Sequence, residues 1–207
     1  MIAAVILAAG HSSRMGRSKA LLPHRDGGTS LVRHAITQAK SAGLKTVIVV
    51  GREGDAELER EVAVAGGTFI ANPEPDRGQL SSLLAALDAL GSDELIVDGV
   101  LVLPVDVPLV SGGVLRAVVL AAEGTAAPIV RAAHHGVHGH PVVFKREIFD
   151  ELRAADPALG AKAVVRADPA RVVDVEVNDP AVLADVDTPA DYERLFGRPL
   201  PETDLPR

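Results

Sequence analysis

The sequence contains no cysteine and no tryptophan, and aromatic residues make up only 2% of its 207 residues. Without cysteine the chain forms no disulfide, binds no metal through thiolates and has no cysteine nucleophile. This composition is compatible with a reducing cytoplasm, which is where we expect the protein. Because hydrophobic residues still account for 47%, the core must consist of Ala, Val and Leu, which fits helices packed on a buried parallel sheet.

Long apolar runs and an excess of positive charge are also missing. No run approaches the roughly 18 apolar residues of a membrane span. The short apolar start, MIAAVILAAG, has no leading basic region, so we expect a strand there and not a signal peptide. The formal net charge of −7 argues against nucleic acid or a membrane surface as a partner. Any anion-binding site must therefore be local.

Apolar, β-rich segments alternate with helical patterns along most of the chain. This alternation predicts an α/β fold, a single Rossmann-like domain with a mainly parallel sheet flanked by helices. The predicted strands are residues 3–8, 46–50, 68–70, 100–105, 127–130, 142–144 and 172–175. The predicted helices are residues 30–42, 55–64, 79–90, 113–123, 147–154 and 189–196.

The predicted domain spans residues 1–197, followed by a loose, proline-rich tail at 198–207. Residues 126–180 are less regular, and we expect them to form a lobe that covers the site. In sheets of this kind, ligands bind beyond the carboxyl ends of the strands. Three loops are therefore expected at one edge, namely residues 9–19, 72–79 and 104–109.

The loop after the first strand carries a cluster of positive charge. Arg14, Arg17, Lys19 and Arg25 follow one another without any acidic residue between them. A glycine, Gly10, gives the backbone the freedom to turn sharply, and the N–H groups of such turns bind anions. The spacing matches neither the usual phosphate loop nor the dinucleotide fingerprint. The residues alone leave two interpretations open, a triphosphate site and a solvated basic loop.

At these residues a family resemblance is visible. The stretch LAAGHSSRMGRSK (residues 7–19) resembles the Leu-Ala-Ala-Gly-x-Ser-x-Arg-Met-Gly-x-x-Lys signature of the MobA/MocA-like nucleotidyltransferases, which build the dinucleotide form of the molybdenum cofactor. NPEPDRGQLSSL, VLPVDVPLV, GHPVVF and NDPAVLADVDTPADYERL are similar to later segments of the same family. The resemblance implies a glycosyltransferase-A-like domain whose loops close over a nucleoside triphosphate, with Lys19 and Arg14 at its phosphates.

Two groups of acidic residues are candidates for a metal site. Asp106 follows the most apolar predicted strand, where a carboxylate is costly unless it lies at the rim. The physical reason to place it there is to hold Mg²⁺ on phosphate oxygens, and the alternative is a turn or cap role. In ADVDTPADY, Thr188 and Asp191 have the spacing of a capping box. Asp187 precedes that cap, and the resemblance alone implies that it is the second metal ligand.

The remaining site residues also come from the resemblance. It implies that the backbone from Leu7 through Ala8 and Ala9 to Gly10 lies against the base and ribose, and that His140 lies near the acceptor. Four residues of RGQLSSL are expected to line the nucleotide pocket, with helix capping by Asp76 or Ser81 as the alternative. They are Gly78, Gln79, Ser81 and Ser82.

The resemblance implies transfer of a nucleoside monophosphate to a phosphorylated, molybdopterin-type cofactor, with Mg²⁺ as cofactor and release of pyrophosphate. Leu7-Ala8-Ala9-Gly10 is the form typical of the cytidine-using branch, and the Ala9 methyl lies where a purine would need space, so CTP is the expected nucleotide. A molybdoenzyme or its maturation chaperone is the partner that the resemblance suggests. Two alternatives remain at this point, an NAD(P)H-dependent oxidoreductase that reduces a quinonoid pigment and a chaperone that binds the cofactor without turnover.

Overall fold

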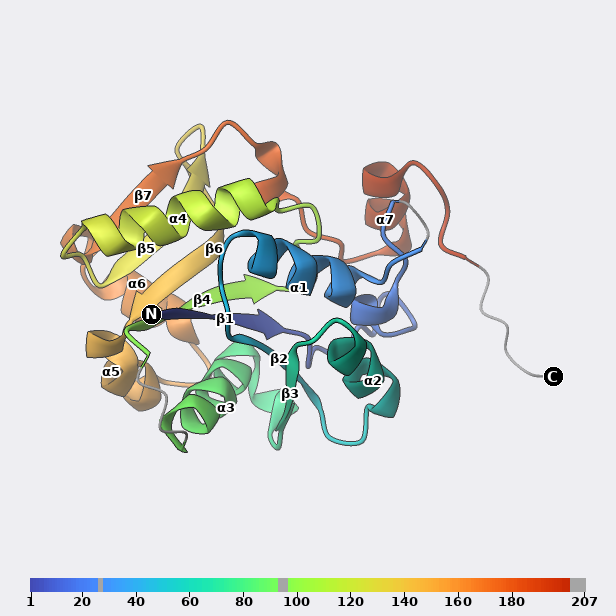
Figure 1. Ribbon diagram of the computed structural model, residues 1–207, viewed down its shortest axis with the longest axis horizontal. Helices are drawn as coiled ribbons and strands as arrows, with labels where there is room; N and C mark the ends of the chain where they lie inside the picture. Colours follow the sequence, from blue (N-terminus) through green and yellow to red (C-terminus); the bar gives the residue numbers. More distant parts are fainter. Residues whose placement is uncertain (26–27, 93–96, 202–207) are drawn as a thin grey trace.

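The computed structural model describes residues 1–25, 28–92 and 97–201 (Figure 1). It contains a seven-stranded sheet in the order β3-β2-β1-β4-β6-β5-β7. The strands are β1 (Ile2–Leu7), β2 (Val47–Arg52), β3 (Thr68–Asn72), β4 (Gly99–Pro104), β5 (Ile129–His134), β6 (Val137–Lys145) and β7 (Val172–Glu176). The α-helices are α1 (Leu31–Ser41), α2 (Ala56–Val64), α3 (Gln79–Ser92), α4 (Gly112–Gly124), α5 (Phe149–Ala154), α6 (Ala161–Ala167) and α7 (Pro189–Phe196).

The predicted α/β fold with a mainly parallel sheet is confirmed. β1 pairs in parallel with β2 and β4, β2 with β3, and β5 with β7. Only β6, among the strands that the structure describes, runs antiparallel to its two neighbours. Because Leu7 is in register with both Val50 and Pro104, β1 and β4 end at the same level, and β2 continues for only two residues beyond it. Their following loops therefore meet at one edge of the sheet.

Helices cover both faces of the sheet (Figure 1). All six residues of β1 are buried, and their side chains alternate between two cores. Ile2, Ala4 and Ile6 join a core with α1, α2 and α4, whereas the intervening residues join a core with α3, α5 and α6. Such a strand, buried on both faces, explains why the sequence reads as a continuous apolar run.

Residues 126–180 do not form the expected lobe. Their strands β5, β6 and β7 continue the same sheet, while α5 and α6 pack on one of its faces. The predicted strands there were too short, because β5 and β6 form a hairpin whose histidine-rich end is polar and half exposed. Helix α6, only seven residues long and without a side-chain cap, carries a weak signal and was not predicted.

The last residues that the structure describes, up to Pro201, lie against the loop after β1. Arg198 donates to the backbone carbonyl of His24, and Arg17 donates to the carbonyl of Pro201. Tyr192 of α7 is fully buried and donates its hydroxyl to Pro23 at 2.6 Å. Residues 202–207 lie outside the described part, so the division into a domain and a loose tail stays a prediction. Within the described residues, no helix has both the length and the hydropathy of a membrane span.

Candidate active site

The loop after β1 is folded so that it presents Lys19 at the sheet edge. Ser12 adopts a positive φ of 50° and closes a turn, in which its carbonyl accepts from the N–H groups of Met15 and Gly16. Its hydroxyl accepts from the backbone N–H of Lys19 at 3.2 Å. Met15 is buried in the core and anchors the loop. The predicted turn after the strand is thus fixed by both a buried side chain and a local hydrogen-bond network.

Asp106 lies just beyond the end of β4, as the sequence predicted. Its side chain is 26% exposed, so the carboxylate is at the rim and not in the core. Its backbone carbonyl accepts from the N–H of Val186 at 2.8 Å. That single bond joins the loop after β4 to a segment eighty residues later, and it places Asp187 next to Asp106.

The segment that carries Asp187 is held at both of its ends. At the C-terminal end, the predicted capping box of Thr188 and Asp191 is confirmed, and Asp191 also accepts from the backbone N–H of Asp187 at 3.2 Å. At the N-terminal end, the backbone of Val182 packs so closely on β6 that a Cβ at Gly139 would clash with its carbonyl oxygen. Glycine is therefore required for this approach.

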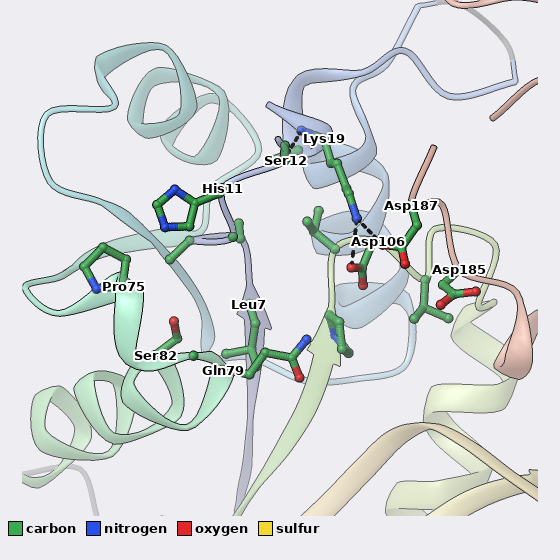
Figure 2. Close-up of a pocket in the computed structure, with 18 of the residues that line it drawn as sticks. Leu7, His11, Ser12, Lys19, Pro75, Gln79, Ser82, Asp106, Asp185 and Asp187 are labelled. Atoms are coloured by element: carbon green, nitrogen blue, oxygen red, sulfur yellow. Dashed lines mark hydrogen bonds and ion pairs between the residues drawn. The ribbon is translucent and has the colours of Figure 1, made fainter. Parts of the chain in front are cut away.

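Lys19 joins the two aspartates (Figure 2). Its Nζ donates to Asp187 Oδ1 at 2.6 Å and to Asp106 Oδ2 at 3.3 Å, and the lysine side chain is only 12% exposed. Arg14, which is largely exposed, donates to Asp187 Oδ2 at 3.0 Å. The two carboxylates therefore face the same small space, although 81 positions separate them in the sequence.

The two carboxyl groups differ in their electrostatics. Burial raises the pKa of Asp106, and the charge of Lys19 offsets this only in part. The hydrogen bond from Lys19 lowers the pKa of Asp187, and the charges of Lys19 and Arg14 add to that effect. The closer Lys19 contact and the greater exposure of Asp187 explain the opposite directions. A further cation next to Asp106 would therefore stabilise its charged form.

These groups open into a cavity of about 590 Å³ at the predicted edge of the sheet. Twelve of the predicted site residues line it, and these are Leu7, Ala8, Ala9, Gly10, Arg14, Lys19, Gly78, Gln79, Ser82, Asp106, His140 and Asp187. A cavity of this size accommodates a nucleotide. The structure thus brings together residues from β1, β4, α3, β6 and the segment before α7.

Ser81 does not line this cavity. Its hydroxyl oxygen lies 2.8 Å from the carbonyl oxygens of both Glu74 and Gly78, to either of which it can donate its single proton, and it accepts from the side-chain amide of Asn72 at 2.9 Å. It lines a second cavity on the outer side of α3 instead. These contacts also differ from the alternative expectation of helix capping, because the hydroxyl donates to carbonyl groups and a cap would accept from backbone N–H groups. The same Asn72 amide donates to Ser82 at 3.0 Å, and Ser82 does reach the nucleotide-sized cavity.

Two carboxylates alone do not make a complete metal site, and no group of three or more potential ligands forms within residues 1–25, 28–92 and 97–201. Mg²⁺, however, is commonly held by one or two carboxylates together with substrate phosphates and water. The Lys19 ammonium already lies between Asp106 and Asp187, so this space favours a cation. The oxygen donors present therefore fit a divalent ion that arrives with a triphosphate.

His140 also lines the cavity, together with Lys162 and Asp185. Its pKa is lowered from 6.5 to about 4, first by burial of the ring and then by the charge of Lys162. The imidazole is therefore neutral at pH 7. Lys162 was not predicted as a site residue, because α6 was not predicted.

The low pKa of His140 predicts acid sensitivity of the fold. Between pH 6.5 and about 4 the unfolded chain binds a proton that the folded chain excludes, so stability falls as the pH decreases through this window. A His140→Gln variant has no imidazole at this position and therefore lacks this pH-dependent loss of stability. We expect wild type to lose about 2 kcal/mol more than the variant between pH 7 and pH 4.5. Urea denaturation of both proteins at the two pH values measures the difference, and equal losses would contradict the prediction.

Some residues that shape the site were missed. Ser12 occupies a fixed position of the signature, so a signal was present in the sequence, but only the structure shows its bond to Lys19. Arg52 at the end of β2 donates to the carbonyl of Ala9 at 3.0 Å. Asp76 and His11 line the cavity and contact each other. No motif marked Arg52 or Asp76 for a site role.

Known proteins resemble the chain over most of its length. The molybdenum cofactor cytidylyltransferase of Escherichia coli (strain K12) is 27% identical over 191 residues, which are 91% of this chain and 92% of that protein. Rv0371c of Mycobacterium tuberculosis H37Rv is 27% identical in its crystal structure, with a TM-score of 0.79 over 95% of this chain and 98% of that chain. A structure of Rv0371c in complex with manganese gives a TM-score of 0.74 at 28% identity, with the same coverage.

A partial match connects the chain to a longer enzyme. The bifunctional protein GlmU of Rhizobium leguminosarum bv. trifolii (strain WSM2304) is 37% identical over 116 residues, which are 55% of this chain but only 25% of that protein. Nothing in these comparisons favours the NAD(P)H-dependent oxidoreductase. The family model described as "MobA-like NTP transferase domain" matches residues 4–173, a span that includes Lys19 and Asp106. The chain therefore belongs to the MobA-like NTP transferase domain family and is a nucleotidyltransferase that acts on a nucleotide substrate.

Proposed function

We propose that the protein transfers CMP from CTP to the phosphate group of a molybdopterin-type cofactor and releases pyrophosphate. The observation that carries the proposal is the contact of Lys19 with Asp106 and Asp187 at one end of a nucleotide-sized cavity. The E. coli relative, a molybdenum cofactor cytidylyltransferase, supports the choice of nucleotide and acceptor.

In the proposed reaction, an oxygen of the acceptor phosphate attacks the α-phosphorus of CTP. A new P–O bond forms, the bond to the β-phosphate oxygen breaks, and the electron pair leaves with pyrophosphate. Because the acceptor is already an anion, the protein needs to supply no nucleophile. Catalysis then rests on positioning and on the stabilisation of negative charge.

Lys19 and Arg14 supply the positive charge of the protein in this reaction. The Lys19 ammonium, which contacts Asp106 and Asp187 in the structure, would exchange these carboxylate partners for phosphate oxygens when a nucleotide binds. Lys19 is largely buried, so its attraction to the phosphates is stronger than that of the exposed Arg14. The hydrogen bond from Ser12 to its backbone holds the start of the side chain in place.

The enzyme uses a divalent metal ion, and we propose that Asp106 and Asp187 hold it as Mg²⁺. The structure of Rv0371c in complex with manganese supports a divalent ion in this fold. When bound, the ion neutralises charge on the α-phosphate and on the departing pyrophosphate. The hydrogen bond from the Asp187 N–H to Asp191 and the bond between Val186 and Asp106 keep the two carboxylates at a fixed separation.

We propose that the part of the cavity lined by His140 and Lys162 is the acceptor side. A neutral imidazole beside an ammonium group suits a ligand that combines a polar ring with a phosphate. A molybdoenzyme or its maturation chaperone is the proposed recipient of the product. The absence of cysteine supports a cytoplasmic location, and we propose residues 1–197 as the catalytic domain.

One assay tests this function. Purified protein is incubated with Mg²⁺, molybdopterin and each of the four ribonucleoside triphosphates, and pyrophosphate release is measured. We expect release that requires molybdopterin and is fastest with CTP. The absence of pyrophosphate release with all four nucleotides, or oxidation of NADH or NADPH by quinonoid acceptors in a parallel assay, would count against the proposal.

The choice of CTP over GTP predicts an effect of Ala9. This residue lines the cavity and is only 4% exposed, so its methyl group occupies space that a purine would need. We expect Ala9→Gly to increase the ratio of kcat/KM for GTP to that for CTP by roughly tenfold. This is about the discrimination that one methyl group in a binding pocket provides. Steady-state assays with both nucleotides measure the ratio. An unchanged ratio would show that Ala9 does not select the base.

A further inference from the structure

The cavity has a second end, away from the metal and phosphate groups. In Figure 2, His11 and Pro75 lie on the opposite side of Leu7 from Lys19, Asp106 and Asp187. If the triphosphate occupies the Lys19 end, as the proposed function requires, the base extends toward this second end. The residues there have not been assigned a role by the family signature.

Asp76 is held at this second end by an imidazole and a guanidinium group. His11 Nε2 lies 2.5 Å from Asp76 Oδ1, and Arg52 Nη2 lies 3.6 Å from the same oxygen. Arg52 also donates through Nε to the carbonyl of Ala9 at 3.0 Å. One arginine thus connects the loop after β1 to the loop after β3 and fixes the carboxylate relative to the Ala9 backbone.

The second carboxylate oxygen of Asp76 remains available to a ligand. Both contacts of Asp76 use Oδ1, and its side chain lines the cavity and is 78% exposed. A carboxylate accepts hydrogen bonds and cannot donate them when ionised. A positioned carboxylate at the base end therefore favours a base that presents an N–H donor.

We propose that Asp76 reads the exocyclic amine of the base and makes the enzyme select cytosine over uracil, an inference that rests on the proposed function. Cytosine presents an N4 amine donor on the edge where uracil presents a carbonyl oxygen, and acidic side chains accept from that amine in nucleic-acid recognition. Uracil would place its O4 against a negative oxygen. Arg52 and His11 are positioning residues that hold Asp76. Ala9 excludes purines, so the two residues together specify CTP.

Calorimetric binding to the intact protein with Mg²⁺ and no acceptor tests this inference. Three ligands are compared, namely CTP, UTP and a CTP analogue in which hydrogen replaces the 4-amino group. We expect wild type to bind CTP at least about tenfold more tightly than either of the others, as one hydrogen bond to a charged group provides. Asp76→Asn should reduce the CTP/UTP ratio to near one, because the amide can donate to O4 as well as accept from N4. The ratio of CTP to the analogue should also fall, because a neutral amide oxygen accepts from N4 more weakly than a carboxylate does.

A matched control is Glu74→Gln, which removes a charge from the same loop but from a residue that pairs with Arg77 at 2.7 Å. This variant should keep both wild-type ratios. Because the affinities of one variant for different ligands are compared with each other, the test still applies if Asp76→Asn shifts the loop and lowers the affinity for all three ligands. Wild-type ratios in Asp76→Asn would overturn the assignment of Asp76 and leave the proposed function intact. Failure of wild type to bind CTP would overturn both.

Discussion

Lys19→Met should lower kcat/KM for CTP by roughly a thousandfold while the fold is retained. Removal of one preorganised group that stabilises transition-state charge costs about 10²–10³ in rate, and Lys19 also provides a full, largely buried charge. Methionine keeps the length and the apolar stem of the side chain. The measurement is steady-state pyrophosphate release with molybdopterin as the acceptor.

The same substitution should have an opposite effect on metal binding without nucleotide. In the structure, the Lys19 ammonium lies between Asp106 and Asp187, where it competes with a cation. Without it, the two carboxylates face each other unpaired except for Arg14. We expect Lys19→Met to bind Mn²⁺ more tightly than wild type. Lys45→Met serves as the matched control, because this exposed lysine precedes β2 and the site lies beyond the opposite ends of the strands. Loss of activity with unchanged Mn²⁺ affinity would contradict this arrangement.

Asp106→Asn should lower kcat by on the order of a thousandfold or more, because a neutral amide binds Mg²⁺ poorly and the metal provides several kcal/mol of charge stabilisation. The free energy of unfolding should not decrease. Burial raises the pKa of the Asp106 carboxyl group, so the charged form is disfavoured at this position and a neutral, isosteric side chain is tolerated. Activity assays at several Mg²⁺ concentrations and urea denaturation measure the two effects.

A loss of activity without a loss of stability distinguishes a metal ligand from a structural residue. A structural aspartate would lower stability when replaced, and its loss of activity would follow the loss of fold. Asp150→Asn, a change at a side chain that is 99% exposed on α5, controls for the removal of one negative charge. Activity within tenfold of wild type for Asp106→Asn would rule out Asp106 as a ligand of the catalytic metal.

The sequence predicted the parts of the site that local signals define. The turn after β1 follows from an apolar strand, a glycine and a basic cluster, and Asp106 follows from a carboxylate at the end of an apolar strand. The family signature predicted Lys19 and Arg14. All of these signals lie within a few residues of the strand that positions the side chain. Because the strands end at one edge of the sheet, the side chains that follow them lie at that edge.

Contacts between distant segments could not be predicted from local signals. The pairing of Asp106 with Asp187 depends on the backbone bond from Val186 and on the close approach at Gly139. Only the family resemblance suggested it, and the family match itself ends at residue 173. Neither periodicity nor charge marks such a contact in the sequence.

Helix phase explains the error at Ser81. Neighbouring residues on a helix point about 100° apart, so Ser81 and Ser82 at the start of α3 cannot both face the same cavity. The sequence does not fix which one does, because Asp76 and Ser81 are both possible caps and the first residue of the helix is therefore not determined. In the structure, Ser82 is buried toward the cavity, and Ser81 bonds to the loop before the helix. Arg52 and Asp76 were missed for a related reason, since their contact joins two loops.

The central claim is that the loop after β1 and two distant aspartates form one metal–triphosphate site. Crystals grown with Mn²⁺ and a non-hydrolysable CTP analogue test it directly, because anomalous scattering locates the manganese. We predict one metal ion bound by Asp106, Asp187 and phosphate oxygens, and we predict that Lys19 Nζ contacts the phosphates instead of the carboxylates. A nucleotide bound with its phosphates elsewhere, or a metal that contacts neither aspartate, would contradict it.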